Sequence, residues 1–428
     1  MNHRYSIRAG LLAALLAGTA APTLADDGVD RSAVITNYAD IALAKYSDSL
    51  ETARDLDAKI DALIEKPSDE TLQAAREAWL AARVPYQQTE AYRFGNPVVD
   101  DWEGRVNAWP LDEGLIDYVD ASYGTESDAN TAYTANIIAN PNLSLNGETI
   151  DAGTITPALL QDTLQEAGGV EANVATGYHA IEFLLWGQDL NGTDAGAGSR
   201  PATDFAAGDE CTGGNCERRA EYLKAASDLL IADLEEMVGN WETDGAARKN
   251  LTDGEPGEAL RAILTGLGSL SYGELAGERM KLGLLLHDPE EEHDCFSDNT
   301  HNSHLYDAKG IQNVYLGTYG GGGSEAVSGP SLSDLVKAKD PALDEEMQTR
   351  LEETMTAMQA IADKAEGGEA YDQQIGEGNE EGNARVQAAI DALIAQTRTI
   401  ERVIAALDLG SIELEGSDSL DNPNAVFQ

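Results

Sequence analysis

Basic and aromatic side chains are scarce in this sequence of 428 residues. It has 28 lysines and arginines against 76 aspartates and glutamates, a formal net charge of -48, and 6% aromatic residues. A surface this negative repels phosphate backbones and anionic lipid headgroups, which argues against nucleic acids and membrane surfaces as partners. Cationic partners, metal ions among them, remain open.

Common catalytic motifs are also missing. The sequence contains no H-E-x-x-H, G-x-S-x-G, G-x-x-x-x-G-K-[ST] or C-x-x-C, so hydrolysis by those standard routes is not expected. Cysteine is limited to three residues. Cys211 and Cys216 stand at the ends of the glycine-rich loop CTGGNC, which favours a short disulfide between them and leaves Cys295 as a free thiol.

Long apolar runs are absent after the first 25 residues. Residues 1–25 combine Arg4 and Arg8 with the apolar run Gly10–Ala20 and small residues before Asp26, the pattern of a cleavable signal peptide. That run is too short for a membrane anchor, and no later stretch reaches the roughly 18 apolar residues of a transmembrane helix. We therefore expect an exported chain without a transmembrane segment, beginning near Asp26.

Helical patterns dominate the rest of the chain. Segments rich in Ala, Leu and Glu with helical period prevail, and the alternation typical of strands is rare. Helices are expected at residues 30–66, 68–93, 157–167, 170–186, 217–240, 257–287, 341–365 and 383–407. We predict an all-α protein of two helical-bundle lobes with long irregular insertions, the first at 26–205 and the second at 206–428. Whether the lobes are a diverged duplication stays open.

The most informative segment is GYHAIEFLLWGQD, residues 177–189. It is apolar on nearly all faces, which is typical of a buried helix, and a spacing of three places His179 and Glu182 on one stripe. A buried carboxylate needs a cationic partner, either a basic side chain or a metal. Because imidazole and carboxylate both bind iron and zinc, the pair is a candidate metal site. The alternative is a structural His-Glu hydrogen bond.

A second polar stripe lies on the helix before Gly95. At helical spacing it carries Trp79, Arg83, Tyr86 and Glu90. Glu90 is a candidate further ligand, and the alternative is an ion pair with Arg83 or with another nearby arginine, Arg93.

Local chemistry adds two more acidic candidates. Asp112 lies in the loop-rich segment WPLDEGLIDY, and Glu278 lies in SYGELAGERM. Gly273 and Gly277, four residues apart in the latter segment, would let another backbone come close. Glu278 faces either the site or water.

Histidines are concentrated in residues 287–304, HDPEEEHDCFSDNTHNSH. Four of the six histidines of the chain lie there among many acids, which suggests affinity for metals. Because the spacing of these residues matches no fixed ligand pattern, a solvated loop is the favoured interpretation. Cys295 in this segment is either a thiol ligand or a small buried hydrophobe.

Several segments resemble a known family. GYHAIEFLLWGQD resembles the G-x-H-x-x-E signature of the imelysin-like proteins, which falls on Gly177, His179 and Glu182. Their iron-regulated protein A subgroup is similar to this chain at WLAARVPYQQTEAYRFG, WPLDEGLIDY, GELAGERM and EEEHDCFSDNTH. The resemblance covers nearly the whole mature chain. It implies two helical lobes with the signature near their junction and a link to bacterial iron uptake in the periplasm or at the outer membrane.

Two functions follow from these residues and this resemblance. The favoured one is a periplasmic protein that binds a divalent metal, iron preferred and zinc as the alternative, through His179, Glu182 and Glu90, with Asp112 and Glu278 as additional candidates. Its partners would be the metal or an iron-containing ligand and components of an uptake system. The second is an imelysin-type zinc metallopeptidase with His179 and Glu182 in its catalytic site. A third interpretation is a scaffold in which His179 and Glu182 pair with Arg83 or Arg279.

Overall fold

The computed structural model describes residues 28–127, 129–145, 147–320 and 323–427. The predicted signal peptide lies outside these residues. Within them, no helix combines the length and the apolar character needed to cross a lipid bilayer.

The all-α prediction is confirmed. The α-helices are α1 (Arg31–Glu65), α2 (Asp69–Gln87), α3 (Pro97–Glu103), α4 (Pro157–Leu159), α5 (Gly177–Trp186), α6 (Cys216–Trp241), α7 (Ala246–Thr252), α8 (Pro256–Ser269), α9 (Leu282–Leu286), α10 (Thr300–Leu316), α11 (Leu332–Lys339), α12 (Pro341–Glu366), α13 (Tyr371–Ile375), α14 (Glu380–Ala406) and α15 (Asp418–Asp421). In the described part of the chain, strands are limited to two antiparallel hairpins, β1 (Asn142–Leu145) with β2 (Glu148–Asp151) and β3 (Thr318–Tyr319) with β4 (Val327–Ser328).

Short helical turns link these elements. Those of 3-10 type are η1 (Glu90–Tyr92), η2 (Glu113–Leu115), η3 (Ala121–Tyr123), η5 (Ala167–Gly169), η6 (Ala202–Phe205), η7 (Gly208–Glu210), η9 (Pro289–Glu291) and η10 (Ala425–Phe427). Those of π type are η4 (Leu160–Leu164) and η8 (Leu270–Lys281).

A first bundle forms around α1, against which both α2 and α6 pack, while α5 packs on α2 and α6. Ser68 caps α2, with a reciprocal hydrogen bond to Thr71. The α-helix ends at Gln87 rather than near Arg93. Two residues before that end, Pro85 lacks the N–H that would continue the helical ladder, and the chain then tightens into η1.

A second bundle is formed by α8 with η8, α10, α12 and α14. The helix expected over residues 257–287 is present as three consecutive stretches, α8, η8 and α9, and the middle stretch η8 is a π-helix. The prediction that Gly273 and Gly277 admit a close backbone is confirmed. A Cβ atom on Gly273 would lie 2.6 Å from the Glu415 carbonyl oxygen, and one on Gly277 would collide with Ser417. The tail after α14 therefore packs on η8.

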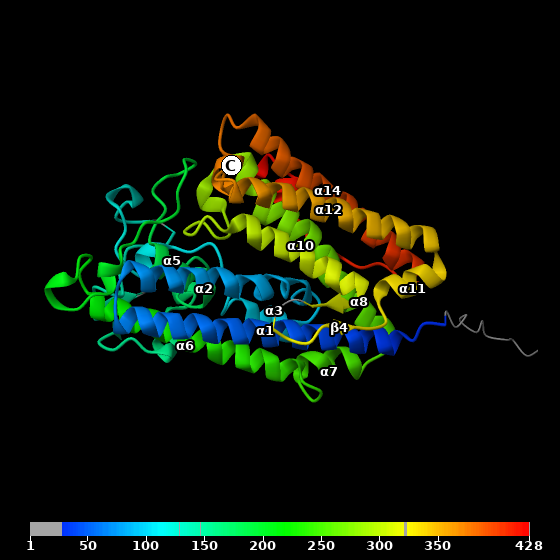
Figure 1. The fold of residues 1–428 in the computed structure, drawn as a ribbon, viewed down its shortest axis with the longest axis horizontal. Coiled ribbons are helices and arrows are strands. Elements are labelled where there is room, and N and C mark those ends of the chain that lie inside the picture. Colours follow the sequence, from blue (N-terminus) through cyan, green and yellow to red (C-terminus); the bar gives the residue numbers. More distant parts are fainter. Residues whose placement is uncertain (1–27, 128, 146, 321–322, 428) are drawn as a thin grey trace, which may run out of the picture.

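The two bundles lie side by side, and α2 of the first contacts α10 of the second (Figure 1). Although α6 follows residue 206 in the chain, it packs with α1. The lobe boundary at residue 206 stays a prediction, as does the duplication. The predicted disulfide between Cys211 and Cys216 is present, with Cα atoms 5.9 Å apart, and Cys295 is a free thiol.

Candidate metal centre

The start of α5 requires glycine. Gly177 has a φ of +77°, and a Cβ atom there would collide with the backbone of Val106. The Tyr178 N–H donates to the Val106 carbonyl oxygen at 2.8 Å, and the Trp79 indole N–H donates to the Tyr178 carbonyl oxygen at 3.0 Å. These bonds fix the first turn of α5, which is buried along its whole length. Gly177 thereby sets where His179 lies.

His179 and Glu182 contact each other inside the protein, as their spacing predicts. The His179 Nδ1 and Glu182 Oε2 atoms are 2.9 Å apart. The other oxygen of Glu182 accepts hydrogen bonds from the Ser297 N–H at 3.0 Å and from its hydroxyl at 2.7 Å. Burial, followed by the charge of Asp294, raises the pKa of Glu182 well above its ordinary value. In the tautomer whose proton lies on Nδ1 and is donated to Glu182, the Nε2 lone pair of His179 is left to bind a ligand.

The histidine-rich segment is not a solvated loop, so that interpretation was wrong. His293 and Asp294, just before α10, and His304 within it are all buried. One ligand atom from each of His179, His293 and Asp294 falls in a group within 4.8 Å of one another. The rings of His179 and His293 meet edge to face at 4.7 Å between centroids. Two imidazoles and a carboxylate therefore converge.

Arg83 of α2 holds the carboxylate of this group. Its Nη2 atom donates to Asp294 Oδ1 at 2.9 Å, and both side chains are buried. Asn299 donates to the other oxygen at 2.8 Å. Burial acts to raise the pKa of Asp294, but the charge of Arg83, with hydrogen bonds from Ser303 and Asn299, outweighs it and holds the pKa below its usual value. Asp294 is therefore an ionised oxygen donor.

The two imidazoles are neutral. Burial, and then the charge of Arg83, lowers the pKa of His179 to about 3, and burial with Arg279 lowers that of His293 well below its ordinary value. Among the described residues, no group hydrogen-bonds His179 Nε2 or either nitrogen of His293. Buried polar atoms are usually satisfied. Unpaired lone pairs on neutral imidazoles fit a transition metal.

Trp109 packs against one of the two histidines of this group. Its half-buried ring meets that of His293 edge to face, with 5.8 Å between centroids. A metal in this centre would be bound by donor side chains that are almost entirely shielded from solvent.

The other predicted ligands lie elsewhere. Glu90 forms an ion pair with Arg279 at 2.7 Å, rather than with Arg83 or Arg93. Arg279 also binds the Asp307 carboxylate at 2.9 Å. Arg83 pairs with Asp294, and Arg279 pairs with Glu90, so neither arginine pairs with Glu182. The scaffold interpretation required one of these arginines as the partner of Glu182 and His179, and the structure does not show that pair.

Asp112 and Glu278 are also outside the group of three. Asp112 accepts a hydrogen bond from Asn130, and burial raises its pKa. Glu278 is half-buried, and its charge contributes to the raised pKa of Glu291. As metal ligands, Glu90, Asp112 and Glu278 stay predictions.

His293 and Asp294 are the site residues that the ligand prediction missed. Their signal was the histidine density of residues 287–304, but nothing in that pattern marked which members turn inward. The partners that bury them, Arg83 and His179, lie more than 100 residues away in the chain.

Comparison with known proteins agrees with this architecture. Over 76 residues, 18% of this chain, the sequence is 30% identical to Iron-regulated protein A of Synechococcus elongatus, of whose length the match spans 21%. A crystal structure from Parabacteroides distasonis, described as an iron-regulated protein A precursor, shares the fold with a TM-score of 0.63 at 20% identity, over 91% of this chain and 97% of that one. The family model described as Imelysin (peptidase M75) matches residues 42–400. The chain therefore belongs to the imelysin family.

Proposed function

We propose that this protein binds one transition-metal ion, iron first and zinc as the alternative, through His179, His293 and Asp294. The observation that carries the proposal is the convergence of three buried donor atoms within 4.8 Å, with imidazole nitrogens that no described group satisfies. Two nitrogens and one oxygen suit iron or zinc and leave a coordination position for a further ligand. This assignment keeps His179 from the sequence prediction and moves Glu182 from ligand to supporting residue.

Glu182 and Arg83 would tune the centre without binding the metal. Glu182 orients His179 through Nδ1, as carboxylates behind metal-binding histidines commonly do. Arg83 fixes Asp294 and adds a positive charge beside the ion. A neighbouring cation weakens the binding of a second one, which suits a protein that must release its metal.

The proposed setting is iron acquisition after export to the periplasm. Support comes from the names of the two relatives, both iron-regulated, and from the sequence pattern of residues 1–25. The partners would be the metal or an iron-containing ligand and components of an uptake system, with the outer membrane as an alternative location. In the periplasm, the net negative charge of the protein would not repel iron cations.

The peptidase alternative is less favoured. A zinc peptidase needs a cleft in which an extended chain reaches the metal. Here His179, His293 and Asp294 are almost entirely inaccessible, and Trp109 covers His293. An extended peptide therefore cannot reach these atoms unless Trp109 and the segment before α10 move.

The test is titration of the metal-free protein, residues 26–428, with Fe²⁺ under anaerobic conditions and with Zn²⁺, by calorimetry. Wild type is expected to bind one ion, and His179→Ala and His293→Ala are each expected to weaken binding at least tenfold. His287→Ala is the matched control, because His287 belongs to the same segment but binds the Ile375 carbonyl oxygen instead. Equal binding by all four proteins would overturn the proposal, and release of fragments from an unfolded peptide substrate would favour the peptidase.

A further inference from the structure

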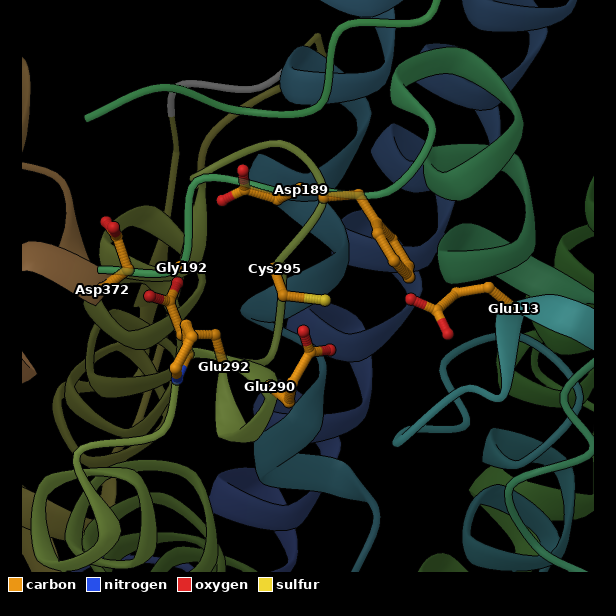
Figure 2. A pocket seen from close by; sticks show the side chains of 9 residues that line it. Glu113, Asp189, Gly192, Glu290, Glu292, Cys295 and Asp372 are labelled. Carbon is orange, nitrogen blue, oxygen red and sulfur yellow. The ribbon is translucent and has the colours of Figure 1, made fainter. Parts of the chain in front are cut away.

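Acidic side chains line two hollows of very different size. In the smaller one, Glu113 and Glu290 approach Cys295 from two sides (Figure 2), and the space open to a water-sized particle is only about 10 Å³. The larger one is a groove with about 540 Å³ of such space, partly open to solvent. Pockets that bind small molecules commonly have volumes of about 300 to 1,000 Å³. The groove therefore has the size of a ligand site.

The groove lies where the two bundles meet. α2 lies between α1 and α10 and contacts both (Figure 1), while β3 also contacts α1 and α10. All four elements contribute to the lining. Ala81, Val84 and Pro85 give α2 an apolar face toward the groove, and Tyr306 of α10 adds an aromatic ring. A ligand in this groove would therefore meet apolar surface from both bundles.

Carboxylates line the α1 side of the groove. Asp48, Glu51 and Asp55 lie at intervals of three and four residues, so they share one face of the helix. Asp48 is occupied, because it accepts hydrogen bonds from the Tyr319 hydroxyl at 2.7 Å and from the Ser324 N–H at 2.8 Å. Glu51 and Asp55 are exposed, and no described group forms an ion pair or a hydrogen bond with either. These two carboxylates are available to a ligand.

Lysines near the groove do not neutralise these acids. Lys309 is the one basic side chain among the described lining residues, and it donates to Gln312 Oε1 at 2.8 Å rather than to a carboxylate. Lys45 is fully buried and donates to the carbonyl oxygen of Gln88 at 2.9 Å, and burial holds its pKa well below the ordinary value. Three carboxylates against one ammonium leave the lining with a net charge of -2. The groove therefore attracts cations.

The lining fits an organic cation better than a metal ion. Glu51 and Asp55 are one helical turn apart, and neither belongs to a group of three described residues whose ligand atoms converge. The methylene groups of an aliphatic amine would instead cover Ala81, Val84 and the Tyr306 ring, as the stems of lysine side chains cover apolar surface. Its ammonium groups would meet the two carboxylates, and one beside the Tyr306 ring would gain a cation–π contact.

We propose that the groove binds one linear aliphatic polyamine, with two ammonium groups on Glu51 and Asp55 and the methylene chain along α2 and Tyr306. Nitrogens separated by three or four methylene groups match carboxylates one helical turn apart, whose Cβ atoms are roughly 5 to 6 Å from each other. Lysine side chains of a peptide share this chemistry, and the experiment distinguishes the two. The inference does not rest on the proposed metal site.

The experiment is calorimetric titration of residues 26–428 with spermidine in 0.15 M NaCl, where interactions between distant surface charges are largely screened. Wild type is expected to bind one spermidine per chain. Glu51→Gln/Asp55→Asn should weaken binding at least tenfold. Ala81→Arg should do the same by filling the groove from an exposed position of α2, which keeps the test valid if one variant does not fold.

Two further variants are controls. Glu70→Gln/Glu352→Gln removes two exposed acids outside the groove, so it matches the charge change of the double variant and should bind spermidine as wild type does. His179→Ala should also bind spermidine normally while losing Zn²⁺. Failure of this proposal can thus be distinguished from failure of the proposed metal site.

Two further ligands of equal charge test the chemistry. Hexaamminecobalt(III) carries three charges without methylene groups, and acetyl-trilysine amide carries three lysine side chains on a peptide. Each is expected to bind at least tenfold more weakly than spermidine. The proposal is overturned if spermidine shows no saturable site, if both groove variants bind it normally, or if the exposed double variant loses as much affinity as they do. Binding of the cobalt complex or of the peptide as tight as that of spermidine would overturn it as well.

Discussion

At the scale of single residues, Gly177 determines where His179 of the candidate metal centre lies. Its φ of +77° belongs to a region that other residues adopt at a cost, and the Val106 backbone occupies the space that a Cβ atom would need. An alanine at residue 177 would meet both the unfavourable φ and the Val106 backbone. The chain cannot move apart to relieve the contact, because the hydrogen bond from the Tyr178 N–H to the Val106 carbonyl oxygen holds α5 against that segment. The glycine of the signature is therefore explained by backbone geometry rather than by chemistry.

Gly177→Ala should lower the free energy of unfolding by at least about 2 kcal/mol, measured by urea denaturation. Gly239→Ala is the matched control, since Gly239 lies within α6 with open space around its Cα atom. That change should raise stability by roughly 0.5 to 1 kcal/mol through helix propensity. If Gly177→Ala is as stable as wild type, the left-handed geometry at residue 177 is wrong.

Glu182 matters for the orientation of His179. Glu182→Gln should keep the fold and weaken Zn²⁺ binding about 10- to 100-fold in calorimetry, because the amide holds the Nδ1–H less strongly than the carboxyl group does. Glu278→Gln is the comparison, since Glu278 lies outside the group of three. An equal loss with Glu278→Gln would support the ligand set expected from the sequence instead.

At the scale of elements, α6 carries a buried acid that couples its packing to pH. Asp233 pairs with Arg105 at 3.2 Å, while its other oxygen has no hydrogen-bond partner among the described residues. Burial raises the pKa of Asp233 to about 6, against 3.8 for the ordinary carboxyl. The folded state therefore holds this proton more tightly than the unfolded state does. The stability that the proton contributes is full below about pH 4 and is lost as pH rises toward 6.

Asp233→Asn should therefore change stability in a pH-dependent way. Relative to wild type, the variant should gain about 2 to 3 kcal/mol between pH 4 and pH 7, because two pKa units correspond to about that energy. Urea denaturation at both pH values measures the difference. Asp228→Asn, which changes an exposed acid on the same helix, should show little of this effect. A pH-independent difference for Asp233→Asn would contradict the raised pKa.

At the scale of the whole molecule, the net charge of -48 opposes folding through repulsion between acidic side chains. Salt screens charges on the surface, with a Debye length of about 10 Å at 0.1 M and about 3 Å at 1 M. Raising NaCl from 0.05 to 0.5 M should therefore raise Tm by at least about 3 °C. Choline chloride at equal ionic strength should act alike, which separates screening from binding of Na⁺. A Tm that is constant or falls with both salts would contradict this expectation.

Much of the helical architecture was predictable, because its signals are local. The Ser68 cap, the apolar periods of α1, α12 and α14, and the short loop between Cys211 and Cys216 each depend on residues a few positions apart. The buried stripe of His179 and Glu182 follows from the same local period. The sequence pattern did not reveal the change from α-helix to π-helix at η8.

By itself, the sequence determined the helices, the disulfide, the acidity and the contact of His179 with Glu182, since these follow from spacing along the chain. Only the tertiary structure decided that His293 and Asp294 join His179, that Arg279 rather than Arg83 or Arg93 takes Glu90, and that Glu292 and Asp372 share a pocket. The physical reason is the same in each case. Packing of elements that are far apart in the chain, α2 against α10 among them, brings together charged groups distant in sequence, and their pairing is set by burial, which no local pattern encodes.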